Sequence, residues 1–97
     1  MSNLHSTLYE AVLSLRSEKE AEAFLADLTT PAEFEALTER WRIANLLYQG
    51  GKSYREIAAE TGASTTTIAR VARFLHDEGN DGYKTILERT AQKRGKK

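Results

Sequence analysis

Helix-start signals recur at short intervals along this chain, and they constrain its fold more than any other feature. A hydroxyl residue is followed three positions later by glutamate in Ser17 with Glu20, Thr30 with Glu33, and Ser53 with Glu56. In this pattern the two side chains satisfy the free N–H groups of a first helical turn. Between the signals apolar residues recur at helical period, and no segment alternates as a half-buried strand does. The sequence therefore predicts an all-α fold of about six helices.

A long helix is predicted over residues 31–49. Pro31 suits the first helical position, where its missing N–H would be unpaired anyway, and Gly50 suits a helix end. One apolar stripe comprises Phe34, Leu37, Trp41, Ala44 and Tyr48, and a second comprises Ile43, Leu46 and Leu47. We assign Trp41 and Tyr48 to the core rather than to a site. A helix this apolar needs more cover than a small domain supplies, so we expect association.

The remaining helices are predicted from shorter apolar patterns. Leu4, Leu8, Val12 and Leu15 mark a first helix, and Phe24, Leu25 and Leu28 mark a second. Asp81 begins a last helix over residues 81–92 that carries Tyr83, Ile86 and Leu87. Residues 93–97 are expected to fray as a basic tail, because they offer no apolar face. We treat residues 1–97 as one domain.

Composition and charge narrow the classes of partner. The chain has no cysteine, and His5 and His76 are far apart, so we expect no metal site. No apolar run approaches the roughly 18 residues that cross a bilayer, and the start lacks a secretory signal, so we expect a cytoplasmic protein with no membrane partner. Residues 1–49 carry 4 basic and 8 acidic side chains, whereas residues 50–97 carry 10 basic and 6 acidic ones. The second half therefore suits a polyanion better.

Residues 53–78 show the spacing of a helix-turn-helix. Ser53 and Ser64 each begin a helix, and Gly62 lies between them in a short turn. Ala58 is small where the two helices must cross, and Ile68 anchors the second helix to the core. In this motif the start of the second helix enters the major groove of DNA. The alternative is a plain helical hairpin whose serine and threonines only cap.

The residues expected to contact DNA lie around these two helix starts. They are Lys52, Tyr54, Arg55, Ser64, Thr65, Thr66, Thr67 and Arg73. Hydroxyl side chains at a helix N-terminus can meet phosphate or base edges, and the basic residues can hold the DNA backbone. For each threonine, base contact and simple capping both remain open.

The stretch "TPAEFEALTERWRIANLLYQGGKSYREIAAETGASTTTIAR" resembles the core of the Trp repressor superfamily, and the whole chain resembles its YerC/YecD branch. This resemblance implies an all-helical homodimer in which the helices of residues 1–49 interlock. The two helix-turn-helix motifs, which are the DNA readers, would then face a palindromic operator. The half-sites would lie about 34 Å apart.

The resemblance also implies a ligand site. Arg40 and Arg70 match two arginines that enclose tryptophan in the Trp repressor, and Thr30 matches a residue that the other subunit contributes. Val71 and Phe74 depart from the small residues of that site, so neither tryptophan nor another cofactor is expected. Alternatively, Arg40 and Arg70 pair with carboxylates such as Glu39 or Glu56, or Arg70 contacts phosphate.

The sequence thus predicts a homodimeric, sequence-specific regulator of transcription that binds double-stranded DNA, with repression as the expected effect. The alternative is a helical interaction module that has lost DNA binding. An enzyme is not expected, because neither histidine has a serine and aspartate constellation beside it in the sequence.

Overall fold

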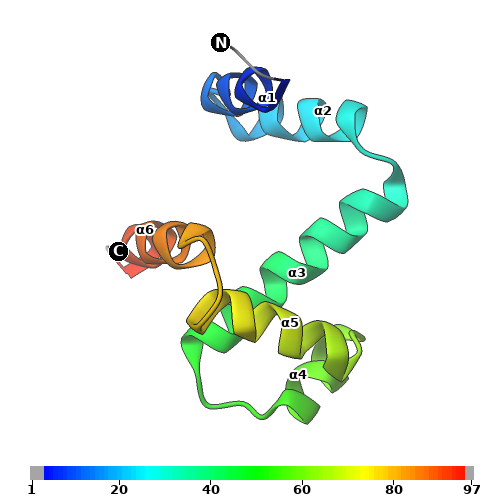
Figure 1. Cartoon of the computed structure of the whole chain (residues 1–97), viewed down its shortest axis with the longest axis vertical. Coiled ribbons are helices and arrows are strands. Elements are labelled where there is room, and N and C mark those ends of the chain that lie inside the picture. The colour runs from blue at the N-terminus through cyan, green and yellow to red at the C-terminus, as the bar shows by residue number, and fades with distance from the viewer. Residues whose placement is uncertain (1–3, 96–97) are drawn as a thin grey trace. The chain divides into compact units, whose positions relative to one another are not determined.

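The structure, a computed structural model, describes residues 4–95, and side chains are described through residue 91. This part of the chain forms helices and no strand (Figure 1). The helices are α1 (Leu4–Leu13), α2 (Glu18–Leu28), α3 (Pro31–Gln49), α4 (Tyr54–Thr61), α5 (Thr65–His76) and α6 (Gly82–Gly95). The predicted all-α class is confirmed.

Two predicted boundaries differ from the structure. Helix α1 ends at Leu13, two residues before the last residue of its apolar pattern. Helix α6 continues to Gly95, beyond the predicted end at residue 92, and residues 96 and 97 lie outside the described part. Asp81, immediately before α6, has a left-handed φ of 66°, and its carbonyl oxygen accepts a hydrogen bond from the Thr85 N–H. None of the helices in the described residues is both long and apolar enough to span a bilayer.

The contacts divide the chain into two units, one reaching to Phe34 and the other beginning at Glu35. The first unit contains α1, α2 and the start of α3, and neither α1 nor α2 has a buried residue. Leu4 is 86% exposed and Leu13 is 83% exposed. The described helices α1 and α2 of the first unit therefore form no buried core by themselves.

Helix starts in the first unit follow the sequence prediction. The Ser17 hydroxyl accepts a hydrogen bond from the Glu20 N–H, although the Glu20 carboxylate accepts from the Arg16 N–H rather than from that of Ser17. At α3 the reciprocal pair is complete. The Glu33 N–H donates to the Thr30 hydroxyl at 3.1 Å, and the Thr30 N–H donates to the Glu33 carboxylate at 2.8 Å.

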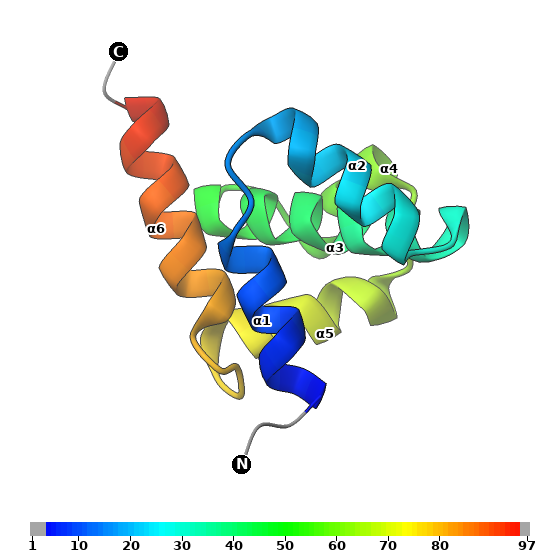
Figure 2. The ribbon, with the colours of Figure 1, turned by 90° about the horizontal axis from the view of Figure 1, so that it is seen from above.

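The second unit has a continuous apolar core to which all of its helices contribute. Its buried residues are Ile43, Ala44 and Leu46 of α3, Ile57 of α4, Ala63 of the turn, Ile68, Val71 and Leu75 of α5, and Leu87 of α6. Each fully buried aliphatic side chain contributes about 1.5–3 kcal/mol. Helix α5 packs against both α4 and α6. Figures 1 and 2 show α5 following α4 and leading through a loop into α6. This core fixes the orientation of α4 and α5.

The core takes some residues from each of the two stripes predicted along α3. Ile43 and Leu46 of one stripe and Ala44 of the other are buried, whereas Leu37 and Tyr48 are 42% and 43% exposed. The assignment of Tyr48 to the core is therefore wrong for the single chain. Trp41 does pack against the core, and its ring stacks on Tyr83 with the centroids 6.4 Å apart. Leu37 and Tyr48 therefore leave α3 with apolar surface that one chain does not cover.

Candidate nucleic-acid interface

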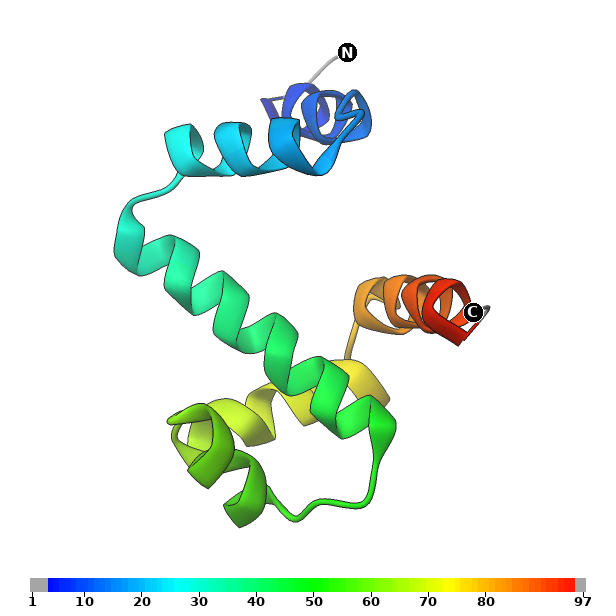
Figure 3. The ribbon, with the colours of Figure 1, turned by 180° about the vertical axis from the view of Figure 1, so that it is seen from behind.

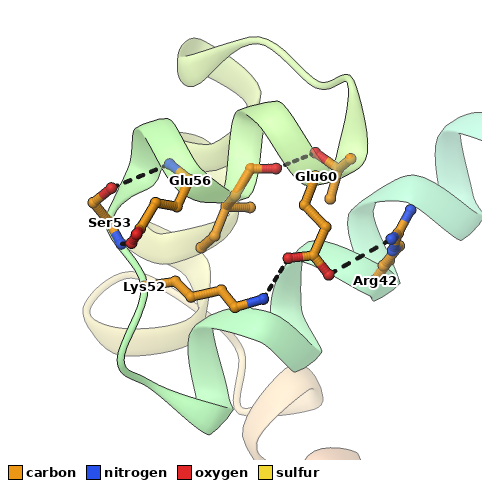
Figure 4. Close-up of polar contacts among 7 residues, drawn as sticks. Arg42, Lys52, Ser53, Glu56 and Glu60 are labelled. Carbon is orange, nitrogen blue, oxygen red and sulfur yellow. Dashed lines mark hydrogen bonds and ion pairs between the residues drawn. The ribbon is translucent and has the colours of Figure 1, made fainter.

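Helix α4 begins with a complete capping box. The Ser53 hydroxyl accepts a hydrogen bond from the Glu56 N–H at 3.1 Å, and the Glu56 carboxylate accepts one from the Ser53 N–H at 2.8 Å (Figure 4). An extended loop from α3 leads into this cap (Figure 3). The cap fixes where the helix starts, so the side chains just after it have a defined direction.

The turn between α4 and α5 depends on Gly62. Its φ of 80° is in the left-handed region, and its N–H donates to the Ala58 carbonyl at 2.8 Å. Side-chain residues seldom adopt this backbone conformation. Ile57 and Ile68 are fully buried on either side of the turn, and Ala58 packs against the same core. The three internal positions predicted from spacing thus join the two short helices to one core.

The hydroxyl residues at the start of α5 divide into two kinds. The Ser64 hydroxyl accepts from the Thr67 N–H at 3.1 Å and also donates to the Thr67 hydroxyl, so this pair forms the cap. Thr65 and Thr66 are exposed, and their hydroxyls make no hydrogen bond among the residues whose side chains are described. The Ile68 N–H is bonded to the Ser64 carbonyl, which leaves the N–H groups of Thr65 and Thr66 without an intrahelical acceptor.

Lys52 is paired rather than free. Its ammonium group donates to one oxygen of the Glu60 carboxylate, and the Arg42 guanidinium lies 3.7 Å from the other oxygen (Figure 4). The hydrogen bond from Lys52 has the largest effect and holds the pKa of Glu60 below its usual value. Desolvation is the next largest effect and opposes it, and the charges of Lys52 and Arg42 each lower the pKa by less. The carboxylate thus connects α3, the loop after it and α4.

A second predicted DNA contact is paired in the same way. Arg73 Nε lies 3.1 Å from the carboxylate of Glu78, just beyond the end of α5. Tyr54 and Arg55 are exposed at the start of α4, and Arg55 has no acidic partner among the described residues. Neither Glu60 nor Glu78 was singled out from the sequence, because their spacings of eight and five residues from the cations are not those of neighbours on one helix face.

The predicted ligand residues are distributed over different places. The Arg70 guanidinium lies over the Phe74 ring, 4.5 Å from its centroid. Both line a cavity of about 610 Å³, whose other lining residues are Trp41, Val71, Gly79, Asn80, Gly82, Tyr83 and Ile86. Arg40 is half-buried and does not line this cavity, and Thr30 caps α3 in the first unit. The structure therefore brings only Arg70 to the cavity.

The alternative ion pairs of these arginines are not found in the described part of the chain. The ion pairs there involve Arg42, Lys52 and Arg73, and the Glu56 carboxylate serves the α4 cap instead. The same residues contain no cluster of three or more His, Asp or Glu side chains placed to hold a metal ion.

Comparison with known proteins identifies the family of the chain. Residues 3–91 match the family described as Trp repressor protein. The chain is 41% identical over 85 residues to the uncharacterised protein YerC of Bacillus subtilis, which covers 88% of this chain and 80% of YerC. It is 36% identical over 88 residues to a Trp operon repressor homologue of Vibrio campbellii, with 88% of each chain covered.

A solved structure gives the same result for the fold. The crystal structure of a TrpR-like protein from Eubacterium eligens superposes with a TM-score of 0.81 at 42% identity, covering 89% of this chain and 87% of that one. The resemblance stated from the sequence is confirmed. The chain belongs to the Trp repressor family, a family of transcription regulators.

Proposed function

We propose that this protein is a cytoplasmic, sequence-specific DNA-binding regulator that acts as a homodimer and represses transcription from a palindromic operator. The observation that carries the proposal is the exposed N-terminus of α5. Thr65 and Thr66 present two hydroxyls and two N–H groups there, on a helix that the buried core and the Gly62 turn hold in place. Membership of a family of transcription regulators supports the proposed role in regulation, and we propose no catalytic role.

The chemistry of this surface suits a duplex. Threonine hydroxyls donate to or accept from base edges, and their methyl groups can contact the methyl group of thymine. Tyr54 and Arg55 are exposed at the neighbouring helix start and would contact phosphates, which position the reader without selecting a sequence. With short side chains at the bases, part of the recognition would pass through water.

A homodimer accounts for the apolar surface that one chain leaves open. In the first unit Leu4, Tyr9 and Leu13 are each more than 60% exposed. On α3, Leu37 and Tyr48 are exposed as well. Burying apolar area yields about 25 cal/mol per Å², so a second copy covering these side chains would stabilise both chains. A two-fold dimer also presents two readers, as a palindromic site requires.

Tryptophan is not part of the proposed mechanism. The Phe74 ring lies beneath Arg70, its centroid 4.5 Å from the guanidinium, so one face of that guanidinium is already stacked on an aromatic ring of the chain. We therefore propose a regulator that binds its operator without tryptophan as corepressor.

The experiment that tests the proposal is selection of duplexes from a random DNA pool by the purified full chain, with and without L-tryptophan. A palindromic motif in both arms is the expected result. A motif only in the tryptophan arm would overturn the corepressor-free mechanism. No motif in either arm would contradict sequence-specific regulation and favour the interaction module.

Two variants separate backbone contact from base contact. Arg55→Ala should weaken binding to all duplexes alike and make the dependence of affinity on salt less steep by about one phosphate contact. Thr66→Ala should change the selected motif. Lys84→Ala, which removes an exposed cation from α6, is the matched control. An unchanged motif for Thr66→Ala would show that this residue does not read bases.

Size in solution tests the dimer separately from DNA. Sedimentation of the purified chain should give a tight dimer, and amide protection of α1 should rise with protein concentration because the second chain covers it. A monomer at micromolar concentration would contradict the homodimer.

A further inference from the structure

We infer that Glu60 competes with DNA phosphate for Lys52 and so limits how many phosphates the reader neutralises. This inference rests on the proposed function and identifies a residue that tunes DNA affinity without touching DNA. Lys52 was predicted to contact the DNA backbone directly. By this inference it must first leave the Glu60 carboxylate of its own chain.

The geometry of the α3–α4 connection supports this competition. Lys52 directly precedes the cap residue of α4, and Glu60 lies two turns farther along that helix. Figure 4 shows the Lys52 side chain reaching along α4 to the carboxylate, with the hydrogen bond drawn between them. A phosphate at the start of α4 and the carboxylate of Glu60 would therefore draw the same ammonium group in different directions.

Arg42 makes the exchange possible at low cost. It lies 3.7 Å from the second oxygen of Glu60, so the carboxylate keeps a cationic neighbour when Lys52 leaves. The Lys52 and Glu60 side chains are 40% and 36% exposed, and exposed ion pairs are weak because water screens them. Lys52 can thus move to a phosphate, but its net gain is reduced by the bond that it gives up.

Arg55 provides the contrast within the same surface. It lies on α4 three residues after Lys52 and has no acidic partner within residues 4–95. A phosphate contact from Arg55 breaks no ion pair, whereas one from Lys52 does. The two cations should therefore contribute unequally to binding, although their charges are equal.

The test measures the affinity of the full chain for its selected duplex and for a scrambled duplex between about 50 and 200 mM salt. The variants are Glu60→Gln, Lys52→Gln and the double variant, and circular dichroism checks that each folds. Glu88→Gln is the matched control, since it removes an exposed carboxylate from α6 that has no cationic partner among the described residues.

Competition predicts that Glu60→Gln binds both duplexes about two- to fivefold more tightly, the range that an exposed ion pair represents. The dependence of affinity on salt should become steeper by up to one phosphate contact. In the Lys52→Gln background, Glu60→Gln should give no more gain than Glu88→Gln does.

Other results identify what failed. Wild-type protein that binds the selected duplex, with Glu60→Gln equal or weaker, would overturn the competition alone and make Glu60 a positioning residue. A gain of the same size in the Lys52→Gln background would also overturn it, because the gain would then not pass through Lys52. If neither the wild type nor any variant binds DNA, the proposed function fails and the competition fails with it.

Discussion

The two units of this chain use the same helix-start chemistry but differ in what lies beneath it. In the first unit, Ser17 and Thr30 cap α2 and α3, yet α1 and α2 bury no residue. In the second unit, Ser53 and Ser64 cap α4 and α5, and Ile57 and Ile68 beneath those helices are fully buried. Local signals therefore decide where helices begin, whereas the core decides which of them hold their orientation.

This difference explains why the candidate interface lies in the second unit. A reader must present Thr65 and Thr66 in a fixed direction, and a rigid, packed support provides that. The first unit instead offers apolar surface. In the proposed dimer, that surface would cover the exposed apolar side chains of α3, such as Leu37 and Tyr48.

The largest expected effect is the loss of a core side chain from the second unit. Ile68→Ala should lower the free energy of unfolding by about 2–5 kcal/mol, because the cavity it leaves adds to the lost burial. Chemical denaturation measures this loss. The comparison variant is Leu13→Ala, which should cost less than about 1 kcal/mol in dilute protein because that side chain is 83% exposed. Equal costs at every protein concentration would contradict the distinction between the units.

The turn of the candidate interface should be the next most sensitive position. Gly62→Ala should lower the free energy of unfolding by about 1–2 kcal/mol, because φ at this residue is 80°. The new methyl group would meet no atom within 4 Å, so it adds no steric clash. The cost would be conformational strain alone. Hydrogen exchange should show the loss in α4 and α5 and leave the protection of α2 unchanged. A uniform loss across both units would mean that they unfold as one.

Equivalent cap deletions compare the units directly. Ser53→Ala should lower stability by about 1 kcal/mol, because the Glu56 N–H loses its acceptor on a helix that belongs to the core. Ser17→Ala removes the same kind of bond from α2 and should mainly increase local fraying, which hydrogen exchange detects. If thermal unfolding showed the same loss for both, α2 would be as firmly integrated as α4.

The smallest expected effect concerns pH and the second unit alone. The pKa of Glu60 is lowered in the folded chain, chiefly by the hydrogen bond from Lys52, from an ordinary value of 4.5. A carboxyl of this kind adds stability above its unfolded pKa, and that contribution disappears as pH falls through the folded pKa. Glu60→Gln should therefore flatten the pH dependence of stability below about pH 4.5. Urea titrations at several pH values, with Glu88→Gln as control, would measure it, and an unaltered profile would argue against the Lys52 pair.

The sequence by itself determined the helices and most of their ends. Caps, glycines and apolar spacing act within a few residues, so Ser53, Gly62 and Ser64 could be assigned without any tertiary information. The same local rules identified Ile68 as the residue that anchors α5 to the core, and it is fully buried. The motif on the long helix and the two short helices also sufficed to recognise the family.

Only the tertiary structure decided which residues of α3 enter the core and which charges are free. Tyr48 repeats at helical period as well as Ile43 does, but a helix of one chain can turn only one face toward a small core. The partners of Lys52 and Arg73 depend on where a loop and a helix end bring Glu60 and Glu78. Ion pairs form between residues that the fold brings together. Periodicity along a sequence does not give the distance between two such residues in space.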